Sequence, residues 1–163
     1  MKKIMFLLLS FTLFAPSVMA AEVEIKWTEP DKYSDIHEGE NHRKNFRKQI
    51  FTNFEKHFSK LASQLPEGQI LKVEVTNVDL AGTTFHSGIN RIRVIKDMYP
   101  PRMKFSYQLL NTDNSIAVEG EADLKDINYM MGRSLRYRSD TLGYEKGMLD
   151  KWFAEIFKPL IEN

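Results

Sequence analysis

The feature that most constrains the fold of this chain is an amphipathic run between residues 42 and 65. Its apolar residues recur at spacings of 4, 4, 4, 3 and 4, which places them on one face of a helix of about six turns. They are Phe46, Ile50, Phe54, Phe58, Leu61 and Leu65. Pro66 follows directly, and proline cannot continue the helical hydrogen-bond ladder. The run therefore predicts a long helix that must bury one face against another layer.

Shorter segments on both sides of this run alternate apolar and polar residues with the period of a β-strand. They lie at residues 23–27, 71–79, 92–94, 103–109 and 116–122. The last three are expected to form a meander, with a turn at residues 111–114. A second amphipathic helix is predicted from Tyr144 to Phe157 and is expected to end near Pro159.

This order, β-α-β-β-β-β-α, predicts a two-layer α+β fold. Strands that alternate cleanly bury one face only, so both helices should cover the same face of one mostly antiparallel sheet of four to five strands. The chain has 163 residues and no cysteine, so packing rather than disulfides must stabilise it. Residues 21–163 are expected to form a single domain.

Residues 1–20 have the pattern of a secretory signal peptide. Lys2 and Lys3 precede an apolar stretch at residues 4–14, and Ala20 ends a small-residue cleavage pattern. The alternative is an uncleaved anchor, but 11 apolar residues are short of the roughly 20 that a bilayer requires. Cleavage after Ala20 predicts a soluble periplasmic protein that does not span the membrane. The formal net charge of +1 for the whole chain argues against a nucleic-acid partner.

A set of short strings runs through the chain after residue 20. They are residues 23–27 followed by 31–33 and 35–36, then 78–82, 92–94, 101–102, 105–107, 124–126, 144–146 and 149–153. In this order the strings resemble a bacterial family catalogued as domain of unknown function 3016. The resemblance implies an exported protein and brings no known activity. Gly147 departs from the family pattern, because a longer polar residue is expected there within the last helix.

One group of charged residues is unusually placed. At 100° per residue, Arg47 falls on the azimuth of the apolar stripe of the long helix, and Arg43 lies close by. Asp79 shares the parity of the apolar residues of the second strand and should face the helix at the level of Arg47. We expect Arg47, with Arg43, to pair with Asp79. The pair either closes the rim of the core or forms a pocket in which the arginines bind a carboxylate or phosphate.

A second candidate binding region lies before the last helix, where arginines alternate with tyrosines. Arg133, Arg136 and Arg138 are interleaved with Tyr129, Tyr137 and Tyr144. Arg136, Tyr137 and Arg138 are the candidates for contact with a glycan or an anionic lipid head group. The alternative is a solvated loop.

No metal, cofactor or catalytic residue is predicted. His37 and His42 bracket Glu38 and Glu40, but their spacing matches no helical metal motif, and a solvated loop explains them better. A phosphate loop, a nucleophile elbow and a His-Glu-x-x-His string are absent from the sequence.

These features favour a non-catalytic envelope binding module whose partner is a protein, a glycan or an anionic lipid head group. The alternative is a small envelope enzyme that uses Asp79 as acid or base and Arg47 as an anion clamp. Assembly through the outer sheet face is a third possibility. That face carries side chains that are too polar for a large permanent interface.

Overall fold

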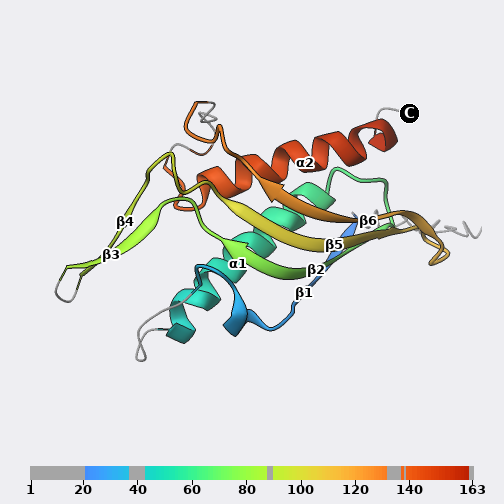
Figure 1. Ribbon diagram of the computed structural model, residues 1–163. Coiled ribbons are helices and arrows are strands. Elements are labelled where there is room, and N and C mark those ends of the chain that lie inside the picture. The colour runs from blue at the N-terminus through green and yellow to red at the C-terminus, as the bar shows by residue number, and fades with distance from the viewer. Residues whose placement is uncertain (1–20, 37–42, 88–89, 132–136, 138, 162–163) are drawn as a thin grey trace, which may run out of the picture.

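The computed structural model describes residues 21–36, 43–87, 90–131, 137 and 139–161. They form a four-stranded sheet, a separate two-stranded hairpin and two long helices (Figure 1). The α+β class and the placement of both helices on one face of the sheet are confirmed.

The sheet is mixed, with strand order β1-β2-β5-β6. Its strands are β1 (Glu22–Trp27), β2 (Ile70–Asp79), β5 (Arg102–Leu110) and β6 (Ile116–Lys125). β1 and β2 are parallel because helix α1 (Arg43–Ala62) crosses between them, whereas β2, β5 and β6 pair antiparallel. The sheet is therefore mixed and not mostly antiparallel as expected, because the helical crossover brings β2 back in the same direction as β1.

The last two strands of the predicted meander, β5 and β6, pair as expected, but the strand at residues 92–94 does not join them. Residues 83–94 form a hairpin of β3 (Thr83–Ser87) and β4 (Asn90–Val94), which pair only with each other among the described strands. β5 then pairs directly with β2. Figure 1 shows the hairpin projecting from one end of the sheet.

Helices α1 and α2 (Gly143–Ile161) bury their apolar stripes against the inner sheet face. The ring of Phe58 lies 6.0 Å from that of Phe105, and Phe105 lies 4.8 Å from Trp152, so both helices meet the sheet at one aromatic cluster. α2 runs through Pro159, two residues beyond its last core side chain, Phe157. Neither helix is apolar enough along its length to cross a bilayer, and the described residues contain no other helix that could.

A short 3-10 turn, η1 (Pro30–Lys32), follows β1 and packs against β2. Tyr33 and Ile36 behind it are fully buried, and the Tyr33 hydroxyl donates to the Val75 carbonyl at 2.7 Å. Burial raises the pKa of Tyr33 to about 12. Tyr33 and Ile36 therefore belong to the core.

Candidate functional site

Arg47 and Asp79 do not pair. The Arg47 guanidinium donates to Asp31 Oδ1 at 2.7 Å, and this ion pair joins α1 to the turn η1. The Arg47 side chain is mostly buried, whereas that of Asp31 is largely exposed. Arg47 therefore holds the segment after β1 against the helix, and the predicted ion pair with Asp79 is wrong.

Asp79 lies on the opposite face of the sheet because β2 contains a bulge. The register with β5 shifts between Val75 and Asn77, and one extra residue reverses the inward and outward alternation beyond that point. Val78 is consequently buried, while Asp79 stands opposite Arg102 on the helix-free face. Burial raises the pKa of Asp79, although Arg102 and Lys125 act in the other direction.

Most of the remaining predicted binding residues cannot be placed relative to one another. The side chain of Arg43 and all of Arg136 and Arg138 lie outside the described residues. Tyr137 is buried, and its hydroxyl donates to Asp150 Oδ2 at 2.8 Å. Tyr129 is buried as well, so neither ring is available for stacking on an external ligand.

The segment of His37, Glu38, Glu40 and His42, which was expected to be a solvated loop, also lies outside the described residues. Among the residues that the structure does describe, no group of three His, Cys, Asp or Glu side chains could hold a metal ion.

A buried ionic contact that the sequence pattern did not predict lies at the base of the β3–β4 hairpin. Glu145, the third residue of α2, is 1% exposed, and its Oε1 accepts hydrogen bonds from the Ala81 N–H at 2.8 Å and from Arg93 Nη2 at 2.5 Å. Arg93 also donates to the carbonyl oxygens of Ala81 and Thr141. One carboxylate and one guanidinium thus fix the hairpin to the end of β2 and the start of α2.

A polar seam continues from this contact between the two helices. Lys146 Nζ donates to Asn53 Oδ1 and Asp140 Oδ2, both at 2.6 Å, and one turn further along His57 Nε2 lies 3.0 Å from Asp150 Oδ1. Burial raises the pKa of Asp140, but hydrogen bonds from Lys146 and the Leu142 N–H outweigh it, so the pKa lies below its ordinary value. These groups bind one another, which indicates a structural role.

The helix-free face, in contrast, presents polar side chains from all four strands. Two rows cross the sheet in register. The first row is Lys26, Glu74, Ser106 and Glu121, and the second is Glu24, Lys72, Gln108 and Glu119. Together they line a hollow of about 730 Å³. We call this surface the open face.

The charges in the hollow are unevenly distributed. On one side, Lys26 pairs with Glu74 at 2.9 Å and Lys72 pairs with Glu24 at 3.2 Å. Ser106 and Gln108 line the hollow from the inner strand β5, and the Gln108 amide donates to Glu119 at 3.1 Å.

A further ionic group closes the open face near Asp79. Arg102 donates from Nε and Nη2 to the two carboxylate oxygens of Asp123 at 2.7 and 2.6 Å, and Lys104 lies 3.2 Å from the same carboxylate. The hydrogen bond from Arg102 holds the pKa of Asp123 well below its usual range. This end of the face is therefore occupied by mutual ion pairs.

The fold and surface define a two-layer α+β domain with one covered and one open, polar sheet face. The chain belongs to the family described as protein of unknown function DUF3016, whose model matches residues 21–155, so the predicted resemblance is confirmed. No curated protein and no solved structure matches the chain.

The structure brings together three of the strings that carry the resemblance. The end of β2 (residues 78–82), the end of β4 (residues 92–94) and the start of α2 (residues 144–146) meet where Glu145 binds Arg93 and Ala81. The strings therefore mark a structural junction of the domain. In the sequence, these strings were the only signal that could have drawn attention to Glu145.

Proposed function

We propose that this protein is a non-catalytic binding module of the periplasm that holds a polar envelope component on its open face. The observation that carries the proposal is that both helices cover one side of the sheet, which leaves a hollow lined by polar side chains from four strands on the other. Concave surfaces with convergent polar groups are the usual places for ligands.

The chemistry of the hollow supports a reversible contact. Two lysines against four glutamates give its lining a formal charge of −2, which favours a ligand that carries positive charge or several hydrogen-bond donors. A face this polar lacks the apolar centre of a permanent protein interface. Binding and release of a polar partner fit this surface better than obligate assembly.

Export is part of the proposal. The pattern of residues 1–20 is that of a signal peptide, and the family match begins at Ala21, the residue after the expected cleavage. Fractionation of cells that express the full chain should recover the protein from the periplasm with Ala21 as its first residue. Recovery with Met1 still attached would contradict the proposed cleavage.

The positions of Asp79 and Arg47 do not support the alternative that the protein is an enzyme. Asp79 and Arg47 lie on opposite faces of the sheet, so they cannot act on one substrate. Of the described carboxylates near the helices, Glu145, Asp140 and Asp150 each face a cationic or hydroxyl partner inside the fold.

Site-specific photocrosslinking in living cells tests the binding face. A photoreactive residue replaces Gln108 in the hollow or, as the matched control, the exposed Gln49 on the outer side of α1. We expect a discrete crosslinked species from position 108 and none from position 49. Equal labelling from both positions, or none from position 108 in exported protein, would contradict the proposal.

A further inference from the structure

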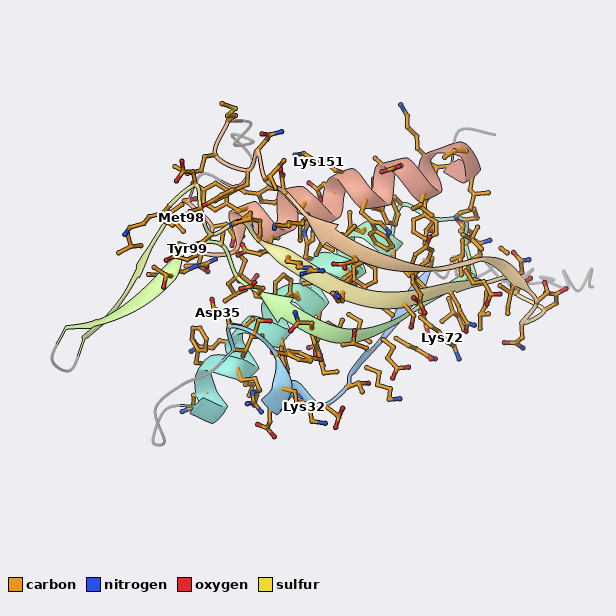
Figure 2. All side chains as sticks on the ribbon, in the orientation of Figure 1. Lys32, Asp35, Lys72, Met98, Tyr99 and Lys151 are labelled. Atoms are coloured by element: carbon orange, nitrogen blue, oxygen red, sulfur yellow. The ribbon has the colours of Figure 1, made fainter. Side chains whose placement is uncertain are left out.

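Two neighbouring loops carry most of the large apolar side chains that are exposed in the described residues. One loop, residues 95–101, joins β4 to β5, and the other, residues 126–131, follows β6. Together they contribute five of the eight such side chains: Met98, Tyr99, Ile127, Met130 and Met131. We call this group the apolar loop patch. Figure 2 labels Met98 and Tyr99 at the end of the molecule from which the β3–β4 hairpin projects.

The two loops are held side by side by Tyr129. Its hydroxyl donates to the Lys96 carbonyl at 2.6 Å, and its ring meets Tyr144 of α2 edge-on at 4.7 Å. The Asp126 N–H also donates to the Pro101 carbonyl at 3.2 Å. A buried tyrosine under exposed neighbours fixes the backbone of the patch in advance, which lowers the entropic cost of docking.

The acidic groups of these loops are used within the protein. Asp97 accepts a hydrogen bond from the Met98 N–H, and Asp126 accepts from the Asn128 N–H and from Lys151 Nζ. Two basic residues lie beside these loops. Lys125 directly precedes the second loop. Lys151 pairs with Asp126 at 2.7 Å, and its side chain stays mostly exposed beside that loop.

From this arrangement we infer that the apolar loop patch docks the protein on a phospholipid surface that contains anionic head groups. The apolar tips enter the boundary between head groups and acyl chains, Tyr99 lies at head-group level, and lysines at the margin contact lipid phosphates. The patch shares no residue with the hollow of the open face, so this inference does not rest on the proposed function.

The shape and composition of the patch favour a lipid surface over a protein. Met131 is 90% exposed, Ile127 68% and Met98 67%, so these side chains project from turns and do not line a groove. Three of the five are methionines, whose flexible thioether chains adapt to a fluid environment without a shaped pocket. An apolar centre with basic residues at its margin is the pattern of peripheral membrane contacts.

Vesicle co-sedimentation tests the inference with protein purified from cells that express the full chain. The probes are vesicles of phosphatidylcholine alone and of phosphatidylcholine mixed equally with phosphatidylglycerol. The test variant combines Ile127→Asp and Met131→Asp, and the control combines Ile116→Asp and Leu160→Asp, two exposed apolar residues outside the patch. All four positions are exposed, and circular dichroism verifies that both variants fold.

We expect wild type and control to bind the mixed vesicles alike and the patch variant to bind them about tenfold more weakly, because each aspartate resists transfer into the lipid interface. Binding to phosphatidylcholine alone should be weaker than to the mixture. The inference is overturned if wild type fails to sediment with the mixed vesicles, or if the patch variant binds them as well as wild type does. Equal binding of wild type to the two lipid compositions would overturn the role of the lysines. None of these results bears on crosslinking from Gln108, so the two proposals fail separately.

Discussion

At the residue scale, Glu145 is the most completely buried charged side chain of the described residues. Its carboxylate accepts from a backbone N–H of one segment and from an arginine of another, while the residue itself is almost completely buried. A buried carboxylate is tolerated only where such partners replace water. The ionic contact therefore determines where the hairpin leaves the sheet, although it adds little net stability compared with an apolar contact of the same size.

Removing this carboxylate should be strongly destabilising. Glu145→Ala leaves the Ala81 N–H and the largely covered Arg93 guanidinium without their partner, and breaking such a pair costs about 3 kcal/mol of unfolding free energy. Urea denaturation followed by circular dichroism measures the loss. Glu155→Ala, at an exposed position of the same helix, is the control and should stay within about 0.5 kcal/mol of wild type. A loss at position 145 no larger than at position 155 would show that the contact is dispensable.

Two carboxylates should affect the pH dependence of stability with opposite signs. The pKa of Asp140 is lowered in the folded state, so its stabilising contribution is present above its ordinary pKa and is lost as the pH falls. The pKa of Asp79 is raised, mainly by burial, so its contribution is present at acid pH and is lost as the pH rises through the folded value.

Asp140→Asn should therefore lower the urea midpoint at about pH 7, and this loss should shrink as the pH falls below the ordinary pKa of aspartate. Asp79→Asn should raise the urea midpoint at neutral pH and change it less in acid. Urea midpoints of wild type and of both variants, measured from neutral to acid pH, test both expectations. Parallel shifts of the two variants at every pH would contradict the assigned pKa directions.

The position of Asp79 shows what a sequence can and cannot predict at this scale. Its alternation with Leu71, Val73 and Val75 was read correctly, and these three residues are buried. The bulge beyond Val75 carries no signature in a single sequence, because it depends on how β2 pairs with β5. One extra residue moved the predicted site to the other face of the sheet.

At the element scale, two glycines occupy opposite physical situations. Gly82 follows β2 with φ of 84°, and a Cβ there would lie 2.5 Å from the Val94 carbonyl oxygen. Gly147 lies inside α2, and nothing would be within 4 Å of its Cβ. The first glycine is needed for a close backbone approach at the base of the hairpin, whereas the second only loosens a helix.

The same substitution should consequently have opposite effects at these positions. Gly147→Ala should stabilise the protein by about 0.5 to 1 kcal/mol, because alanine restricts the unfolded chain and favours helix. Gly82→Ala should destabilise it by about 1 to 3 kcal/mol, because backbone strain is added to the contact with Val94. Thermal unfolding of both variants provides the comparison. A stabilising Gly82→Ala would mean that the hairpin base adapts at little cost.

Periodicity predicted the elements better than their pairing. The helical period located α1 and α2, and alternation located β1, β2, β5 and β6 to within a few residues. The sequence pattern did not predict β3. Pairing could not be predicted, because local pattern does not tell whether a hairpin joins the sheet or leaves it. Here Arg93 and Glu145 hold the hairpin outside the sheet, and their contact spans 52 residues of sequence.

At the scale of the whole molecule, the two sheet faces are chemically distinct. The covered face contributes to one continuous core with both helices, whereas the open face carries in-register charges. The apolar loop patch lies in loops that follow β4 and β6, and it shares no residue with the hollow of the open face. A lipid surface at the patch therefore does not compete for the hollow of the open face.

A single core implies that the domain unfolds as one unit, and its two tryptophans can test this. Trp27 on edge strand β1 stacks on Phe51 of α1 at 4.0 Å, while Trp152 of α2 contacts Phe105 and Tyr107 in the middle of the sheet. Both residues therefore report on helix–sheet packing, at different places in one cluster. Cooperative unfolding of a domain of this size should abolish both environments together with the helices.

We expect urea transitions followed by tryptophan fluorescence and by far-ultraviolet circular dichroism to coincide. Trp27→Phe leaves fluorescence from Trp152 alone, and its fluorescence and dichroism midpoints should still coincide, since the substitution changes stability without dividing the core. Separate midpoints in either protein would contradict a single core. They would indicate that β1 and α1 detach while α2 stays packed on β5, in which case the ion pair of Arg47 with Asp31 would belong to a unit that opens on its own.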